Sequence, residues 1–152
     1  MKPVRIIPRL DVKGANLVKG VHLEGLRVIG RPERFASSYY QDGADELLYI
    51  DAVASLYGRN NLEEIVKRTA EDVFIPITVG GGIRFIDDIR RLLNAGADKV
   101  AINTAAIRNP EIITEGAKVF SSQCIVISIQ AMKVGLKIYS NFVSNFQQKD
   151  NY

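Results

Sequence analysis

The sequence has very few of the residues from which many active centres are built. Of its 152 residues, one is cysteine, one is histidine and none is tryptophan. A single cysteine leaves no disulfide within the chain. Because Cys124 and His22 lie far apart, they argue against a zinc site and against a Ser-His or Cys-His dyad. We expect a buried Cys124, no metal, no cofactor, and acid–base chemistry that depends on carboxylates.

Long apolar runs and a large excess of one charge are also missing. No run approaches the roughly 18 residues of a membrane span, and the first five residues contain no signal-peptide core. The net charge is +3, with both signs interspersed. This balance suits an anionic small molecule and argues against nucleic acid. We therefore expect a cytoplasmic protein without a membrane or nucleic-acid partner.

Strand and helix patterns alternate along most of the chain, which has the length of one domain. The alternation weakens after residue 130, so we expect a domain over residues 1–130 and a divergent tail over 131–152. Within the tail, residues 137–143 could form one more strand. The predicted strands cover residues 5–12, 46–51, 73–79, 99–103 and 123–128, and the predicted helices cover 31–40, 60–69, 85–94 and 110–120.

Repeated strand–helix units predict a parallel sheet with helices outside it. Two folds fit this pattern, an open doubly wound sheet and a (β/α)₈ barrel. Gly-Ala-Asp occurs twice, at 43–45 and 96–98, each time between a helix and a strand. Such a repeat is what duplicated units would leave. The residues by themselves keep both folds open.

Polar residues close nearly every predicted strand. Because ligands bind at the carboxyl ends of parallel strands in both folds, these residues are site candidates. The segment from residue 12 to 30 is too long for a simple turn and predicts a hairpin over this rim, from which Lys19 could reach a phosphate. The rim candidates are Asp11, Asp51, Gly80, Gly81, Gly82, Asn103, Thr104 and Gln130.

The triple glycine at residues 80–82 has two explanations. Glycines between a strand and a helix let backbone N–H groups bind a phosphate. A tight turn with positive φ would also need one or two glycines. At the opposite strand ends, Arg5, Glu46 and Lys99 could form a ring of ion pairs, or they could be ordinary exposed ends.

Six segments together resemble one known family. They are RIIPRLDVKG, NLVKGVHLEGLR, GADELLYIDAVAS, FIPITVGGGIR, AGADKVAINTAAIRNP and SQCIVISI, between residue 5 and about residue 130. They are similar to the cyclase subunit of imidazole glycerol phosphate synthase, from histidine biosynthesis. The resemblance implies a (β/α)₈ barrel, here a half barrel of about four βα units plus a fifth strand. It also implies that ammonia from a glutaminase subunit reacts with a phosphoribulosyl-formimino aminoimidazole carboxamide ribonucleotide.

The resemblance assigns roles to the candidate residues. Asp11 matches the aspartate that acts as acid–base catalyst, and Lys19 matches the loop lysine. Gly82, Asn103 and Thr104 match the first phosphate site, and we add Asp51 and Gly81 to the substrate-binding set. At the bottom of the barrel, the gate for ammonia matches Arg5, Glu46 and Lys99, and Asp98 falls in the region that faces the glutaminase.

The sequence departs from the family in three respects. Arg9 stands where cysteine is usual, and an inward arginine is costly without a partner. Gln130 replaces the second catalytic aspartate and cannot transfer a proton at neutral pH. The chain is also shorter than a barrel of about 250 residues, and Met132 stands where lysine is favoured. We therefore expect impaired activity, a disrupted longer gene, and possible self-association of half barrels through their open edges.

Two alternatives remain beside the cyclase hypothesis. One is a non-catalytic remnant that binds phosphate or docks a glutaminase, which Gln130 and the early stop favour. The other is an isomerase of the sister barrel in the histidine pathway, whose first-loop pattern fits residues 19–27 less well.

Overall fold

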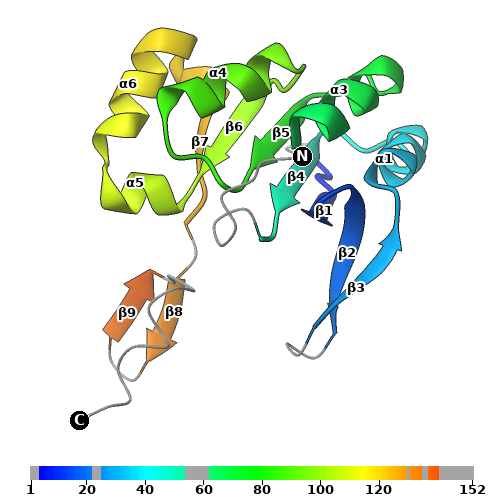
Figure 1. The fold of residues 1–152 in the computed structure, drawn as a ribbon, viewed down its shortest axis with the longest axis horizontal. Coiled ribbons are helices and arrows are strands. Elements are labelled where there is room, and N and C mark those ends of the chain that lie inside the picture. Colours follow the sequence, from blue (N-terminus) through cyan, green and yellow to red (C-terminus); the bar gives the residue numbers. More distant parts are fainter. Residues whose placement is uncertain (1–3, 22–24, 54–61, 130, 135–136, 141–152) are drawn as a thin grey trace.

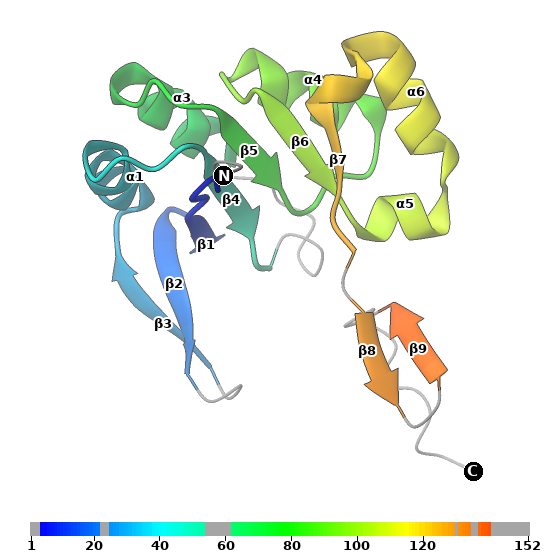
Figure 2. The ribbon, with the colours of Figure 1, turned by 180° about the vertical axis from the view of Figure 1, so that it is seen from behind.

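The computed structural model describes residues 4–21, 25–53, 62–129, 131–134 and 137–140. Its main body is one seven-stranded sheet with helices packed along it (Figures 1 and 2). The strands are β1 (Arg9–Lys13), β2 (Asn16–Val21), β3 (Gly25–Gly30), β4 (Leu47–Asp51), β5 (Ile77–Gly80), β6 (Lys99–Ile102) and β7 (Ile125–Ile127). The helices are α1 (Pro32–Gln41), α3 (Leu62–Asp72), α4 (Ile86–Asn94), α5 (Thr104–Arg108) and α6 (Glu111–Phe120).

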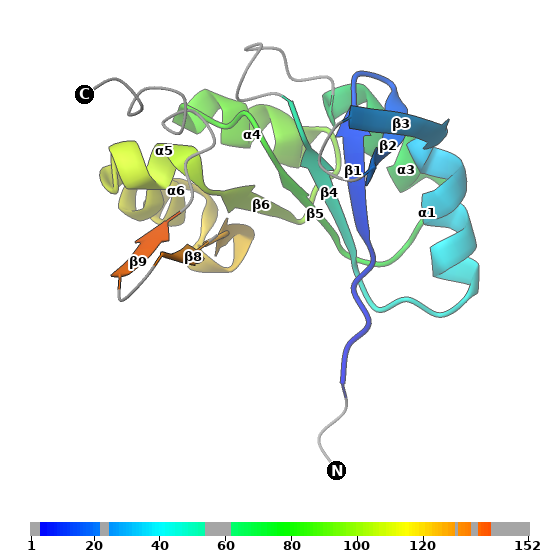
Figure 3. The ribbon, with the colours of Figure 1, turned by 90° about the horizontal axis from the view of Figure 1, so that it is seen from below.

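The order of the strands decides between the two folds that the sequence left open. The sheet runs β3-β2-β1-β4-β5-β6-β7, and β1, β4, β5, β6 and β7 are mutually parallel. Each new parallel strand is added on the same side, so the order never reverses as it does in a doubly wound sheet. Figure 3 shows β1, β4, β5 and β6 side by side in this sequence. The chain is a partial (β/α)₈ barrel, as the resemblance implied.

One face of the sheet carries the hydrophobic core. Alternate strand residues are buried against the helices, including Leu10, Val12, Leu47 and Tyr49. Successive helices also pack against each other, α1 on α3, α3 on α4 and α4 on α6, so they cover the same face. Because side chains alternate along a strand, the residues between these core positions lie on the opposite, inner face.

The two Gly-Ala-Asp segments adopt the same structure at two helix ends. Gly43 and Gly96 have φ values of +86° and +112°, which a side chain would disfavour. Ala44 N–H donates to the carbonyl of Tyr39, and Ala97 N–H donates to that of Leu92. Both helices therefore end in a Schellman motif, and the next residue leads into a strand.

Several predicted boundaries were wrong. The first strand begins at Arg9 rather than at residue 5. The carbonyl of Ile6 accepts the N–H of Asp45, just before β4, and the carbonyl of Pro8 accepts the N–H of Leu48 in β4. Pro8 itself has no N–H with which to donate a ladder hydrogen bond. Similarly, β5 begins at Ile77, after Pro76, rather than at residue 73. The predicted helix start at Asn60 lies outside the described residues.

Two hairpins extend from the sheet, and the sequence indicated one of them. Strands β2 and β3 form the expected hairpin after β1, and β2 also pairs with β1. Residues 131–140 form a separate two-stranded sheet of β8 (Ala131–Val134) and β9 (Lys137–Ser140). Both hairpins lie beyond the end toward which the parallel strands point (Figure 1). Among the described residues, no helix is long and apolar enough to cross a membrane.

Candidate functional site

The inner face of the sheet is arranged in rows of paired residues. Residues Asp11, Ile50, Gly80, Ala101 and Val126 pair across neighbouring strands and form the row nearest the carboxyl ends. The row beneath it contains Arg9, Leu48, Thr78 and Lys99. These registers place Asp11 on the inner face near the rim, with polar and charged residues one row below.

Asp11 forms an ion pair with Arg9. The Nε of Arg9 donates to Oδ1 of Asp11 over 2.8 Å, and the two side chains are 49% and 38% exposed. The arginine that seemed costly on the inner face therefore has a carboxylate partner and access to solvent. Their spacing of two along a strand places both on one face, so the sequence contained the signal for this pair.

The three glycines of residues 80–82 have separate structural reasons. A Cβ on Gly80 would lie 2.9 Å from Ile50 Cδ1 and 3.0 Å from Ala101 Cβ, so the inner row has no space for it. Gly81 has φ +102°, and its Cβ would lie 2.6 Å from the carbonyl oxygen of Asp51. Gly82 has φ +72°. Close packing and the turn account for these glycines, so they are not by themselves evidence of a phosphate site.

Asp51 does not join Asp11 on the inner face. It pairs with Val12 and is buried, which places it in the alternate set that faces the helices. Its Oδ1 accepts the backbone N–H of Val53 over 3.0 Å. This bond stabilises the turn that follows β4, so the structure gives Asp51 a local role.

The predicted phosphate residues lie at the ends of two neighbouring strands. Gly82 and Asn103 each follow a paired inner-row residue, Gly80 and Ala101, by two positions. Asn103, Thr104 and Gly82 are partly exposed. The carbonyl of Asn103 accepts the N–H groups of Ala106 and Ile107, which starts the short helix α5. The sequence did not predict α5, because five residues are too few to show a helical period.

Lys19 lies on β2, where it pairs with Arg27 of β3 and is exposed. The hairpin therefore carries two cations side by side. Gln130 and His22 lie outside the described residues, so the structure gives no position for the second aspartate site.

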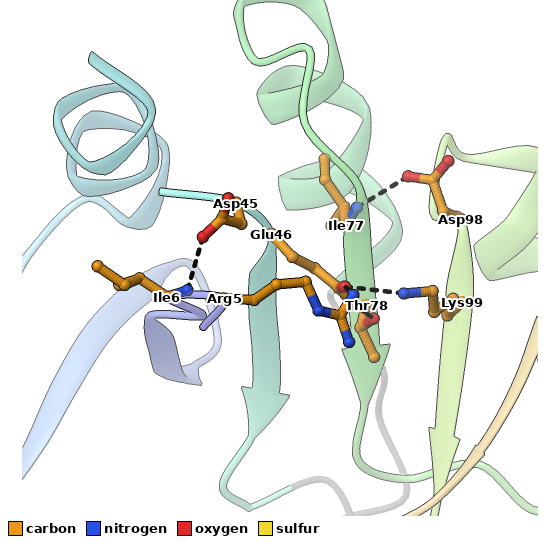
Figure 4. A network of polar contacts seen from close by, with 8 residues as sticks. All are labelled: Arg5, Ile6, Asp45, Glu46, Ile77, Thr78, Asp98 and Lys99. Atoms are coloured by element: carbon orange, nitrogen blue, oxygen red, sulfur yellow. Dashed lines mark hydrogen bonds and ion pairs between the residues drawn. The ribbon is translucent and has the colours of Figure 1, made fainter. Parts of the chain in front are cut away.

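A charged cluster lies at the opposite ends of the strands (Figure 4). Oε2 of Glu46 accepts from Nζ of Lys99 over 2.8 Å and from Nη1 of Arg5 over 3.3 Å. Oε1 of Glu46 accepts the hydroxyl of Thr78 over 2.5 Å. The structure brings the three predicted gate residues together and adds Thr78, an uncharged residue within the apolar strand pattern of β5 that gave no signal in the sequence.

Glu46 remains ionised despite its burial. Burial acts to raise its pKa, but the hydrogen bonds from Lys99 and Thr78, with the charges of Lys99 and Arg5, outweigh this effect. The pKa of Glu46 is therefore held below its ordinary value. A buried carboxylate with three donors is a fixed negative charge between two cations.

Asp98 and Asp45 occupy equivalent positions around this cluster (Figure 4). Oδ2 of Asp98 accepts the N–H of Ile77 over 2.8 Å, and Oδ2 of Asp45 accepts the N–H of Ile6 over 2.7 Å. Both carboxylates are on exposed residues. Asp98, just before β6, thus bonds to the first residue of β5, and Asp45, just before β4, bonds to the segment that leads into β1. Asp98 therefore has a structural role in addition to its predicted position facing a partner.

No cluster of three or more histidine, cysteine, aspartate or glutamate residues suited to a metal ion occurs in the part of the chain that the structure describes. Cys124 is a free thiol and is only partly buried, so the prediction of a buried Cys124 was wrong.

Comparison with known proteins gives one consistent result. Residues 5–150 match the family described as histidine biosynthesis protein. The chain is 67% identical over 133 residues to the imidazole glycerol phosphate synthase subunit HisF of Legionella pneumophila, covering 88% of this chain and 63% of that protein. It is 55% identical over 133 residues to HisF of Methanopyrus kandleri, with coverages of 88% and 49%. HisF of Natranaerobius thermophilus is 51% identical over 139 residues, with coverages of 90% and 55%. The chain thus spans about half to two thirds of these relatives.

Proposed function

The chain belongs to the family of histidine biosynthesis proteins, and from this premise we propose that it is a cyclase-type chain of imidazole glycerol phosphate synthase. In this reaction, ammonia and the phosphoribulosyl-formimino aminoimidazole carboxamide ribonucleotide give imidazole glycerol phosphate, aminoimidazole carboxamide ribotide and water. The relatives reported above, which carry the name of this synthase subunit, support the assignment.

The position of Asp11 carries the proposal. Its partly exposed carboxylate lies on the inner face near the carboxyl end of β1. Gly82, Asn103 and Thr104 follow β5 and β6 at the same end of the sheet. Since β4 alone separates β1 from β5, the carboxylate and the glycine lie about two strand spacings, or about 10 Å, apart across the sheet. A phosphorylated ribosyl group fits such a separation.

In the proposed mechanism, Asp11 transfers protons while the rim holds the substrate. The carboxylate takes a proton as ammonia adds and returns it as the ring closes. General acid–base help of this kind contributes typically about 10²–10⁴ in rate. Backbone N–H groups near Gly82 and Thr104 would bind one phosphate, and the exposed Lys19 of the hairpin would add a cation.

We further propose that ammonia arrives from the opposite ends of the strands, where a glutaminase subunit would dock. The cluster of Glu46, Lys99 and Arg5 lies on that side. Its charges are fixed by mutual ion pairs, so a partner that displaces one cation could open the interior of the barrel to a small neutral molecule.

Gln130 favours a second candidate, a non-catalytic remnant that binds phosphate or docks a glutaminase. A glutamine cannot take or give a proton at neutral pH. Restoring the carboxylate with Gln130→Asp separates the two functions. A large gain in turnover supports the cyclase. No gain, with phosphate binding retained, supports the remnant.

The proposal is tested by ammonia-dependent turnover with ammonium salts in place of a glutaminase. The purified chain should form imidazole glycerol phosphate, and Asp11→Asn should abolish its formation. An active full-length relative serves as the positive control. Conversion of the corresponding phosphoribosyl-formimino ribonucleotide to its phosphoribulosyl form, without ring closure, would instead indicate an isomerase.

A further inference from the structure

We propose that Arg9 is a positioning residue for Asp11, and this proposal rests on the proposed function. Arg9 is the one hydrogen-bonding or ion-pair partner of the Asp11 carboxylate within the described part of the chain. The bond of 2.8 Å joins Nε of the guanidinium to Oδ1 of the carboxylate. Arg9 therefore occupies one oxygen and leaves Oδ2 as the oxygen that can exchange a proton.

The backbone under this pair is firmly held. Arg9 pairs with Leu48 and Asp11 pairs with Ile50 in the parallel ladder between β1 and β4. The residue between them, Leu10, is 1% exposed and packs in the core. Since the main chain is fixed at both positions, the remaining freedom of Asp11 is rotation of its side chain, and the bond from Arg9 restricts that rotation.

A purely stabilising role would be a poor explanation of this contact. Both side chains are substantially exposed, and exposed ion pairs contribute little to stability. Arg9 also comes from the row beneath Asp11, so its guanidinium approaches the carboxylate from the interior side. This arrangement leaves the rim side of Asp11 open to a substrate.

The test compares three substitutions in the full chain. Arg9→Met removes the donor, Arg9→Lys keeps a cation with a different geometry, and Arg34→Met removes an exposed arginine of α1 as a matched control. We expect Arg9→Met to lower kcat about 10²-fold, as a misplaced catalytic group does, with KM for the ribonucleotide unchanged. Arg9→Lys should recover part of the loss, and Arg34→Met should resemble the wild type.

Two results would overturn the proposal. They are an unchanged kcat in Arg9→Met, whether or not KM rises, and an equal loss in Arg34→Met. Thermal unfolding of each variant verifies that it is folded. If Arg9→Met fails to fold, Arg9→Ala replaces it, because it also removes the donor and adds no bulk to the inner face.

A second measurement decides the proposal even when the wild type shows no turnover. In that case the proposed function fails for this chain, and the Nε–H resonance of Arg9, assigned with Arg9→Lys, is observed by NMR. We expect the N–H to exchange slowly with water in the wild type and rapidly in Asp11→Ala. The same exchange rate in both proteins would mean that Arg9 does not hold Asp11.

Discussion

Oδ2 of Asp98 accepts the backbone N–H of Ile77 over 2.8 Å, while the N–H of Asp98 donates to the carbonyl of Ile77 over 2.9 Å. The two bonds fasten the approach of β6 to the first residue of β5. Asp45 and Ile6 repeat the arrangement at β4 and β1, with distances of 2.7 and 3.0 Å. The two Gly-Ala-Asp segments therefore form the same pair of hydrogen bonds to the neighbouring strand or the segment before it.

Removing the aspartate carboxylate from this motif should lower the stability of the chain even when no partner is bound. In Asp98→Ala the N–H of buried Ile77 loses its acceptor, which should cost about 1–3 kcal/mol. Asp98→Asn keeps an acceptor oxygen and should cost less. Urea unfolding of the isolated chain measures both. Equal stability of Asp98→Ala and the wild type would show that Asp98 matters only to a partner.

The ion pairs of Glu46 predict a loss of stability in acid. The pKa of Glu46 is held below its ordinary value of 4.5, so the unfolded chain binds this proton more readily. The contribution of Glu46 is therefore present above about pH 5 and is lost as the pH falls through its folded pKa. Urea unfolding gives the free energy of unfolding of the wild type and of Glu46→Gln. The difference between these two free energies should narrow below pH 4.5. A difference independent of pH would contradict the ion-pair account.

Tyr49 links the sheet to the helices through a buried hydroxyl. It bonds to Oγ1 of Thr69 over 2.9 Å, and Tyr49→Phe should cost about 0.5–1.5 kcal/mol. The exposed Tyr39 gives a matched control, since Tyr39→Phe should have little effect. Equal losses of stability in Tyr49→Phe and Tyr39→Phe would contradict a stabilising role of the hydrogen bond between Tyr49 and Thr69.

The same hydroxyl should titrate late. Burial raises the pKa of Tyr49 to about 12, with an opposing effect from the bond to Thr69 and a further rise from Glu33. Its contribution to stability is present below the ordinary pKa of 10.0 and is lost as the pH rises through about 12. An absorbance titration that includes Tyr49→Phe should identify it as a late-ionising phenol. Its ionisation together with the exposed tyrosines would contradict its burial.

Gly43 and Gly81 both have positive φ, but only at Gly81 would a Cβ meet neighbouring atoms. Comparing the two therefore distinguishes the cost of backbone strain from the cost of a steric clash. Gly43→Ala meets nothing within 4 Å, so it should cost only about 1–2 kcal/mol for the left-handed conformation. Gly81→Ala also places an alanine at positive φ, and its Cβ would in addition overlap the backbone of Asp51 at 2.6 Å. Gly81→Ala should therefore destabilise the chain more in urea unfolding. Equal costs would mean that this turn can relax.

The sequence predicted the alternating strands and helices because the apolar periods of β4, α4 and α6 are clear. It could not predict α5 or β8, which are too short for a period to be visible. It also could not choose between the two folds, since strand order depends on pairing between distant segments. The resemblance to a known family supplied that choice, and the strand order confirmed it.

The candidate site was predicted less completely than the fold. Residue types alone indicated Arg5, Glu46 and Lys99, because charges at three strand ends suggest ion pairs. They did not indicate Thr78, whose hydroxyl matters only because the register of β4 and β5 places it beside Glu46. The triple glycine suggested a phosphate site, but turn geometry and close packing are enough to explain it.

The most direct test of the account is ammonia-dependent turnover of the ribonucleotide by this chain and by its Asp11→Asn variant, at several protein concentrations, beside an active full-length relative. We predict formation of imidazole glycerol phosphate by the wild type, at a rate below that of the relative, and none by the variant. Equal product from the two proteins, or no product from the wild type while the relative is active, would contradict the proposed role of Asp11 in this chain.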